Sequence, residues 1–386
     1  MNENRTVYQS LVEYEAYLET FSEKLRKGPE GDGLSGLCGF DGFVDTFIRM
    51  RQPASMAAFG PKVAAAAGVA ASYSVEHQGD KFGGNGPLFV CALHDLLDGN
   101  VELVYAGGIG AGDAEPLFAA ALKGKVARMV ALAPPAHSDC LEFTDGKVML
   151  GDFRACSEIT LARLLEEMGE TELDALLEKA AFVSAVNWGK LPHVGEIWSE
   201  IPRRLARLGR EPKSVPFFMD LAEFEHREKD EVAGLVARLP EITEVCTTLL
   251  SFNLKEAWQM GAFFGENYQG RKEPAAVADL AAALWGHLEV DKVVIHPNNG
   301  AACASEAGVV YMPGPHCQDP LISTGAGDNF GAGCLVGLLS GQDDAGMLLT
   351  GNAASGFFVR AGRSGTLAEL ADLVAAWQAG RLGERL

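Results

Sequence analysis

Six short apolar runs, each separated from the next by a segment with helical periodicity, constrain the fold of this chain more than any other feature. The runs occupy residues 37–47, 101–110, 180–189, 214–222, 244–253 and 291–297. The helical patterns cover residues 87–97, 115–123, 191–208, 227–239, 255–260 and 274–288. This alternation predicts an α/β fold, with a doubly wound, mainly parallel sheet and helices on both faces. Ligands of such sheets bind beyond the carboxyl ends of the strands.

Three segments lie outside the alternation. Residues 8–27 carry apolar side chains at three- and four-residue steps, which predicts an amphipathic helix within an N-terminal helical extension, residues 1–30. Residues 31–386 are then expected to form one large domain. Within it, segments at about 46–82 and 138–158 interrupt the pattern, and the second contains the hairpin signal Asp145-Gly146. We expect these two segments to form a small β lid.

Composition limits the classes of function. Of the 386 residues 48% are hydrophobic, no stretch approaches 18 consecutive apolar residues, and the acidic N-terminus does not resemble a signal peptide. We therefore expect a soluble, cytoplasmic protein. Its net charge of −20 argues against nucleic acid and membrane partners. A phosphate-bearing ligand would need Mg²⁺ and backbone amides to offset this charge. The eight histidines show no metal-ligand spacing, so we expect no metal beyond Mg²⁺.

The segment ISTGAGDNFGAGCLVGLLSG, which begins at Ile322, carries the clearest chemical signal. Small residues from Thr324 to Gly327 lead into an apolar helical run that begins near Asn329, and the free amides of such a turn can hold a phosphoryl oxygen. Asp328 stands in the first helical turn, where a carboxylate is either a helix cap or a base for a nearby hydroxyl. A dinucleotide loop is disfavoured because it should follow the first strand of its unit, and no P-loop motif is present.

The residues from Ser323 to Phe330 resemble the C-terminal signature of ribokinase-like kinases, also called the phosphofructokinase-B family. Four further segments resemble this family in order and spacing: GFDGFVD at 39–45, Gly83-Gly84-Asn85, the strand, turn and helix at 105–122, and Asn253-Leu254-Lys255-Glu256. The resemblance runs from about Leu37 to about Leu373. It implies an enzyme that transfers the γ-phosphate of ATP to a hydroxyl of a sugar or sugar-like molecule.

The resemblance also implies residue roles. Asp328 would be the general base, beside an anion hole formed by Gly325, Ala326 and Gly327. The expected substrate-binding residues are Asp41, Asp45, Gly83, Gly84, Asn85 and Asn187. The expected cofactor-binding residues are Asn253, Glu256, Thr324, Gly300 and Asn352, of which Asn253 and Glu256 would orient Mg²⁺ through water.

Several of these roles have a structural alternative. Asp41 and Asp45 lie four apart in one predicted strand and should share a face, but a solvated turn would also suit them. Asn253 and Glu256 fit a helix capping box as well as a metal site. Trp188 could stack on a ligand or belong to the core.

Three departures from the family pattern affect the expected cofactors. Ile322-Ser323-Thr324 replaces the usual Asp-Thr-Thr, so a monovalent cation is doubtful. Ile295, His296 and Pro297 replace the usual Thr-Leu-Gly, so the nucleotide contacts there should differ. Leu88 replaces an Asn, and Asn85 stands where a Lys is usual, which predicts an unusual acceptor pocket.

The leading hypothesis is therefore an ATP-dependent carbohydrate kinase. A nucleoside kinase of the same fold is the first alternative, since the spacing of Asp41 and Asp45 also resembles those enzymes. A non-catalytic sugar- or nucleotide-binding protein is the second, and a nicotinamide-dependent dehydrogenase is a more distant third. Because lid-mediated dimers are common among the relatives, the resemblance allows a homodimer.

Overall fold

A computed structural model of the protein describes residues 5–8, 13, 15–29 and 33–386. Within these residues a sheet of ten strands has the order β1-β14-β13-β12-β11-β10-β9-β2-β5-β6. The strands are β1 (Arg5–Val7), β2 (Leu34–Phe40), β5 (Val101–Gly107), β6 (Arg128–Ala131), β9 (Phe182–Val186), β10 (Pro216–Asp220), β11 (Thr247–Asn253), β12 (Lys292–His296), β13 (Gly300–Ser305) and β14 (Gly308–Pro313). Neighbours pair in parallel, except that β13 is antiparallel to both β12 and β14.

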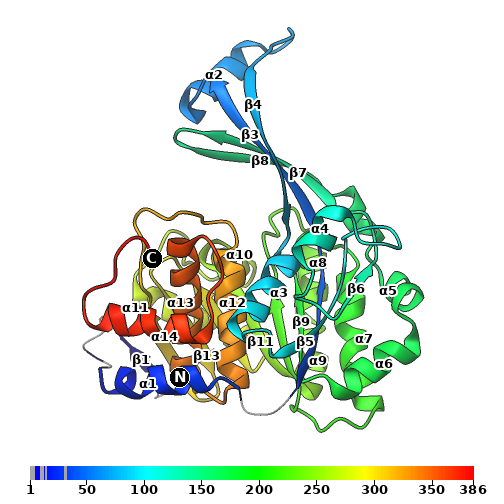
Figure 1. Ribbon diagram of the computed structural model, residues 1–386, viewed down its shortest axis with the longest axis vertical. Helices are drawn as coiled ribbons and strands as arrows, with labels where there is room; N and C mark the ends of the chain where they lie inside the picture. The colour runs from blue at the N-terminus through cyan, green and yellow to red at the C-terminus, as the bar shows by residue number, and fades with distance from the viewer. Residues whose placement is uncertain (1–4, 9–12, 14, 30–32) are drawn as a thin grey trace.

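Helices cover both faces of this sheet (Figure 1). One face packs against α5 (Leu161–Met168), α6 (Glu170–Lys179), α7 (Val194–Arg207), α8 (Lys229–Val236), α9 (Leu239–Val245), α10 (Leu254–Phe263) and α11 (Pro274–Leu288). The other packs against α1 (Glu15–Lys27), α3 (Asn85–Leu96), α4 (Pro116–Ala121), α12 (Ala326–Leu339), α13 (Asp344–Ala361) and α14 (Leu367–Gln378). Strand side chains alternate between the two cores: Phe217 and Met219 of β10 join one, and Phe218 joins the other.

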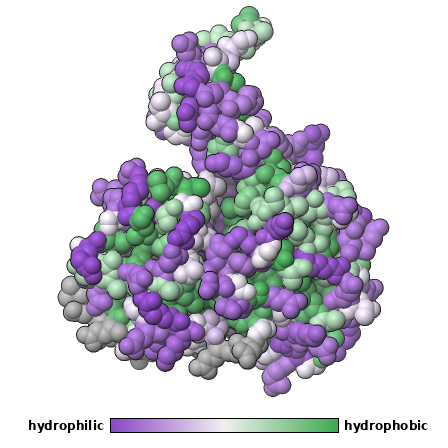
Figure 2. All heavy atoms as spheres, viewed as in Figure 1, coloured by the Kyte–Doolittle hydropathy of each residue, from purple (hydrophilic) through white to green (hydrophobic). Residues whose placement is uncertain are grey.

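A second sheet of four strands stands away from this body as a lid (Figures 1 and 2). Its order is β4 (Ser74–Gly83), β3 (Phe43–Gln52), β7 (Ala136–Phe143) and β8 (Gly146–Asp152), with α2 (Met56–Ala65) at its outer end. β3 pairs antiparallel with β4 and parallel with β7, and β7 and β8 form a hairpin. The hairpin predicted from Asp145-Gly146 is therefore present, with Gly146 paired to Phe143.

The predicted strand at 37–47 is wrong as one element. It is split into β2 of the body and β3 of the lid, and the chain passes from one sheet to the other at Asp41 and Gly42. A Cβ atom at Gly42 would overlap the carbonyl oxygen of Gly108, so this passage requires glycine.

The N-terminal segment contributes to the body. The helix predicted at 8–27 is α1, which begins at Glu15; residues 9–12 and 14 lie outside the described residues. β1 was not predicted and pairs in parallel with β14. Leu18, Phe21 and Leu25 of α1 are buried in the core.

Two further details differ from expectation. The helix predicted at 227–239 is divided between α8 and α9, and α12 begins at Ala326, ahead of the expected Asn329. Among the described helices, none has the length and apolar character needed to cross a membrane.

Candidate active site

Polar side chains at the carboxyl ends of neighbouring strands form the floor of a cavity of about 860 Å³ under the lid. Asn187 follows β9, Asp220 ends β10, Asn253 ends β11 and His296 ends β12, and all four line the cavity. The lid supplies the opposite wall, which includes Asp45 and residues 137–139 and 149–153. We call this space the acceptor cavity.

The turn before α12 enters the acceptor cavity from the other face of the sheet. Gly325 adopts φ +96° as the N-terminal cap of α12, and Thr324, Gly325 and Gly327 line the cavity. The Ala326 N–H donates to the Ser323 carbonyl at 3.2 Å. Among the described residues, neither the Gly325 nor the Gly327 N–H has an acceptor. The turn can therefore offer two amides to an anion.

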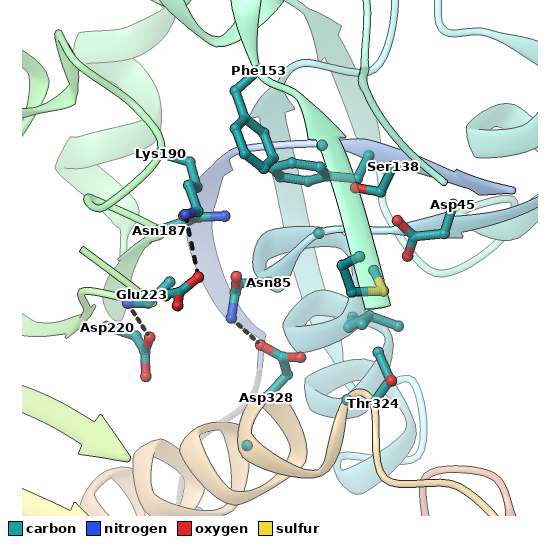
Figure 3. A pocket seen from close by; sticks show the side chains of 18 of the residues that line it. Asp45, Asn85, Ser138, Phe153, Asn187, Lys190, Asp220, Glu223, Thr324 and Asp328 are labelled. Atoms are coloured by element: carbon teal, nitrogen blue, oxygen red, sulfur yellow. Dashed lines mark hydrogen bonds and ion pairs between the residues drawn. The ribbon is translucent and has the colours of Figure 1, made fainter. Parts of the chain in front are cut away.

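Asp328 lies in the first turn of α12 and points into the acceptor cavity toward Asn85 (Figure 3). The Asn85 side-chain amide donates to Asp328 Oδ1 at 3.0 Å. Burial, followed by the negative charges of Asp220 and Asp41, raises the pKa of Asp328 well above its ordinary value. This carboxylate is thus disposed to take up a proton.

Asp41 lies beneath the cavity and does not line it. Its carboxylate is fully buried and accepts hydrogen bonds from the Asn85 N–H at 2.8 Å, the Gly86 N–H at 2.7 Å and the Asn187 side-chain amide at 2.6 Å. These contacts hold the N-terminus of α3 against the end of β9. Burial raises the pKa of Asp41 to about 6, although the hydrogen bonds oppose the rise.

Asp45 belongs to the lid. It lies in β3 and lines the acceptor cavity, so the prediction that Asp41 and Asp45 share one strand face is wrong. Gly83 and Gly84 bring both carboxylates close, because a Cβ on Gly83 would overlap Asp45 and a Cβ on Gly84 would lie 3.1 Å from Asp41 Oδ2. The Gly-Gly pair therefore lets the chain pass between the two acids.

Asn253 and Glu256 form the capping box of α10. The Asn253 N–H donates to Glu256 Oε2 at 3.0 Å, and the Glu256 N–H donates to Asn253 Oδ1 at 3.0 Å. Both residues also line the acceptor cavity. Burial and the charge of Asp220 raise the pKa of Glu256 well above its ordinary value. In the described part of the chain no three potential metal ligands converge closely enough to hold an ion by themselves.

A second cavity, of about 320 Å³, lies on the other side of the α12 turn. We call it the donor cavity. Gly300, Ala326 and Asn352 line the donor cavity. Thr324 and Glu256 line the acceptor cavity and do not line the donor cavity. The Asn352 side-chain amide is already bonded to the carbonyls of Met312 and Pro313, at 3.1 and 3.2 Å. Three residues, Asn253, His296 and Gly327, border both cavities.

The sequence predicted only that nucleotide contacts near His296 differ from the family pattern, and the structure places this residue where the two cavities meet. Its ring stacks on Phe330 with centroids 4.6 Å apart. Burial lowers the pKa of His296 to about 4, so the ring is neutral near pH 7. Its place at the end of β12 was the available signal. Asp220, at the end of the run SVPFFMD, was missed although it carried the same signal.

Trp188 follows the core interpretation. It is 5% exposed, its ring lies 4.4 Å from the Arg227 guanidinium, and it lines neither cavity. The cation that does border the acceptor cavity from this loop is Lys190, which donates to Glu223 at 3.4 Å.

Comparisons with known sequences agree with this geometry. A model of the prokaryotic ketohexokinase family matches residues 22–377. The ketohexokinase of Haloferax volcanii is 26% identical over 353 residues, which cover 88% of this chain and 90% of that protein.

Solved structures of similar fold include three kinases of different substrates. An Arabidopsis thaliana ribokinase complexed with ribose and ATP has a TM-score of 0.62 and 17% identity, covering 89% of this chain and 99% of its own. Escherichia coli phosphofructokinase-2 has a TM-score of 0.61 and 13% identity, covering 90% of this chain and 100% of its own. A Methanocaldococcus jannaschii nucleoside kinase has a TM-score of 0.58 and 13% identity, covering 90% of this chain and 99% of its own. These likenesses concern the fold.

Proposed function

Because the chain belongs to the prokaryotic ketohexokinase family, we propose that it transfers the γ-phosphoryl group of ATP to a hydroxyl group of a ketohexose. Membership makes it a sugar kinase of the ribokinase-like fold. The observation that carries the finer proposal is the position of Asp328, whose carboxylate enters the acceptor cavity beside a Gly-rich turn that also borders the donor cavity.

In this proposal the sugar occupies the acceptor cavity and the nucleotide occupies the donor cavity. Asp328 removes the proton from the attacking sugar hydroxyl, while the oxygen of that hydroxyl bonds to the γ-phosphorus. The bond from that phosphorus to the β,γ-bridging oxygen breaks, and ADP leaves. The raised pKa of Asp328 suits it to accept this proton.

The remaining predicted residues would position these groups. The Gly325 and Gly327 amides would stabilise negative charge on the phosphoryl oxygens, with Ala326 completing the turn. Asn85 would orient Asp328, and Asp41 would hold Asn85 and Asn187 in place. Asp45 and Asn187 would bind sugar hydroxyls, because both line the acceptor cavity and Asn187 Oδ1 is buried without a partner among the described residues.

Mg²⁺ suits the acidic end of this site. Asp220, Glu256 and Asp328 line one cavity, and burial together with the negative charge of neighbouring carboxylates raises the pKa of each, an effect that a divalent cation would offset. Asn253 and Glu256 would hold the ion through water, in keeping with its reluctance to lose its hydration shell. When bound, Mg²⁺ neutralises phosphate oxygens. We propose no monovalent cation.

The domain limits and the assembly are also proposals. We assign residues 1–30 to an N-terminal helical extension and residues 31–386 to the kinase domain, with lid segments at about 46–82 and 138–158.

Gly300, Asn352 and Thr324 would contact the nucleotide, with Thr324 reached from the acceptor side. A homodimer joined through the lid is supported by the exposed apolar side chains that the lid carries.

The test combines a substrate panel with one substitution. Ketohexoses, other sugars and nucleosides are incubated with Mg·ATP, and ADP release is measured. We expect turnover with a ketohexose. Asp328→Asn should lower kcat by roughly 10²- to 10⁴-fold and leave sugar binding, measured by calorimetry, within about twofold.

Asp343→Asn is the matched control, because the Asp343 carboxylate caps α13 through the Gly346 N–H at 2.9 Å and does not line the acceptor cavity. If Asp328 were only a helix cap, both variants would keep full kcat. Turnover of nucleosides alone would favour the nucleoside kinase alternative. Sugar binding by wild type without any turnover would favour the non-catalytic one.

A further inference from the structure

The acceptor cavity is rich in carboxylates and poor in cations. Among the described residues that line it, Lys190 is the only lysine or arginine, and it is already bonded to Glu223. The acidic residues of the lining are Asp45, Asp139, Asp152, Asp220, Glu223, Glu256 and Asp328. A phosphoryl group that enters this space adds further negative charge. A positive side chain near the α12 turn would therefore lower the barrier to transfer.

Lys147 places such a charge at the turn from the lid. It is the second residue of β8, and its ammonium donates to Thr324 Oγ1 at 2.6 Å. Thr324 lies directly before Gly325, at the boundary between the acceptor cavity and a neighbouring cavity of about 820 Å³ that Lys147 lines. Burial raises the pKa of Asp45, and the Ser138 hydroxyl and the charge of Lys147 oppose that rise. Asp45 and Lys147 line this neighbouring cavity together.

Three other basic residues of the lid, Arg49, Arg51 and Lys81, line the same neighbouring cavity as Lys147. Arg51 is ion-paired with Glu76 across β3 and β4, and Lys81 lies 4.7 Å from the centroid of the Phe47 ring. Within the described residues, Lys147 supplies the side-chain hydrogen bond between the lid strands and the α12 turn.

We propose that Lys147 is a catalytic residue carried by the lid, whose ammonium binds the transferred phosphoryl group at the α12 turn and thereby couples lid closure to phosphoryl transfer. The proposal rests on the proposed function. In this proposal the ammonium exchanges its bond to the Thr324 hydroxyl for one to a phosphoryl oxygen when the substrates bind. A charged phosphate oxygen is a stronger acceptor than a neutral hydroxyl, so the flexible lysine favours the phosphate once both substrates are bound. That preference shifts the lid toward the closed arrangement.

The test compares Lys147→Met, Lys147→Arg and Lys62→Met. Lys62 lies on α2 at the outer end of the lid and lines neither of the two cavities, so its substitution removes the same charge from the same element. We expect Lys147→Met to lower kcat roughly 10- to 100-fold, the loss of one hydrogen bond to a charged group. KM for the sugar should stay within about twofold. Lys147→Arg should recover part of kcat, and Lys62→Met should match wild type.

Two results would overturn the proposal. The first is a kcat of Lys147→Met within twofold of wild type. The second is a loss of sugar affinity, measured without nucleotide, that is as large as the loss of kcat. That result would make Lys147 a support for the lid wall. A third measurement separates this proposal from the proposed function: calorimetric titration with inorganic phosphate in the presence of Mg·ADP. Wild type should bind phosphate more tightly than Lys147→Met even if the tested sugars are not phosphorylated, and equal affinities would count against Lys147.

Discussion

Asp41 organises the site from beneath its floor. One carboxylate receives two amides from the start of α3 and one from the Asn187 side chain, so it joins three segments that are far apart in the sequence. The same burial that makes these hydrogen bonds effective disfavours the charge that they need. The result is a pKa of about 6, above the ordinary value of 3.8.

This pKa predicts a pH dependence of stability. The folded protein holds the Asp41 proton more tightly than the unfolded chain, so the contribution of Asp41 is largest below about pH 4 and is lost as the pH rises through about 6. We expect the difference in unfolding free energy between wild type and Asp41→Asn to fall by about 1 kcal/mol from pH 5 to pH 7. Urea unfolding of both proteins measures it. Parallel pH profiles would show that Asp41 has no raised pKa.

Single residues were predictable where a motif or a helix start marked them. Asp328, the Gly-rich turn, Asn187 and Asn253 lie at the cavities as their positions after strands and before helices suggested. Asp41 could not be separated from Asp45 because local spacing does not show that the chain changes sheets between them. Lys147 has no local signal at all, because its partner Thr324 is 177 residues away.

At the scale of elements, the start of α12 requires a glycine for two separate reasons. Gly325 combines a φ of +96° with close packing, because a Cβ there would lie 3.1 Å from Phe358 Cζ. Gly341, which follows the other end of α12, has a φ of +64° and open space around it. Substitutions at the two glycines can therefore be compared: both would introduce backbone strain, but only the one at Gly325 would also introduce crowding.

We expect Gly325→Ala to lower the unfolding free energy by about 1–3 kcal/mol and to reduce kcat at least about tenfold, because the turn must shift. Gly341→Ala should lower the unfolding free energy by about 1 kcal/mol and leave kcat unchanged. Urea unfolding and ADP release measure the two effects. Full activity of Gly325→Ala would show that the turn does not position the phosphoryl group.

The regular elements followed from periodicity, and the exceptions have physical causes. Strands buried on both faces, such as β9 and β10, are continuous apolar runs and were recognised. β13 and β14 were missed, since the small residues of GAACAS and the short run GVVYMP carry little strand signal. β1 is three residues long and depends on its pairing with β14, which the local sequence does not show.

At the scale of the whole molecule, the predicted carbohydrate kinase of the ribokinase-like family and its α/β fold with a small β lid are confirmed. The family signature made this possible, because its motifs occur in order over most of the chain. The choice of sugar, the domain limits and the cytoplasmic location stay predictions. They depend on how lid and body meet around a ligand and on the surroundings of the protein, which no local pattern encodes.

The lid also bears on assembly. Four of the eight large apolar side chains exposed on the described residues belong to the lid or to the loop after α2 and do not line the acceptor cavity: Met56, Val63, Val69 and Val75. Apolar residues gather at its outer tip (Figure 2). Exposed apolar groups concentrated on one projecting element favour a protein interface over a solvated surface.

We therefore expect a homodimer joined lid to lid, with twice the mass of the 41.0 kDa chain in light scattering at micromolar concentration. Val63→Lys with Val69→Lys should produce monomers, because two charges would have to be buried at the interface. Neither residue lines the acceptor or the donor cavity, so this variant also reports whether one subunit is sufficient for turnover. Leu386→Lys, which charges an exposed leucine outside the lid, should stay dimeric. A monomeric wild type would assign the apolar tip of the lid to another partner.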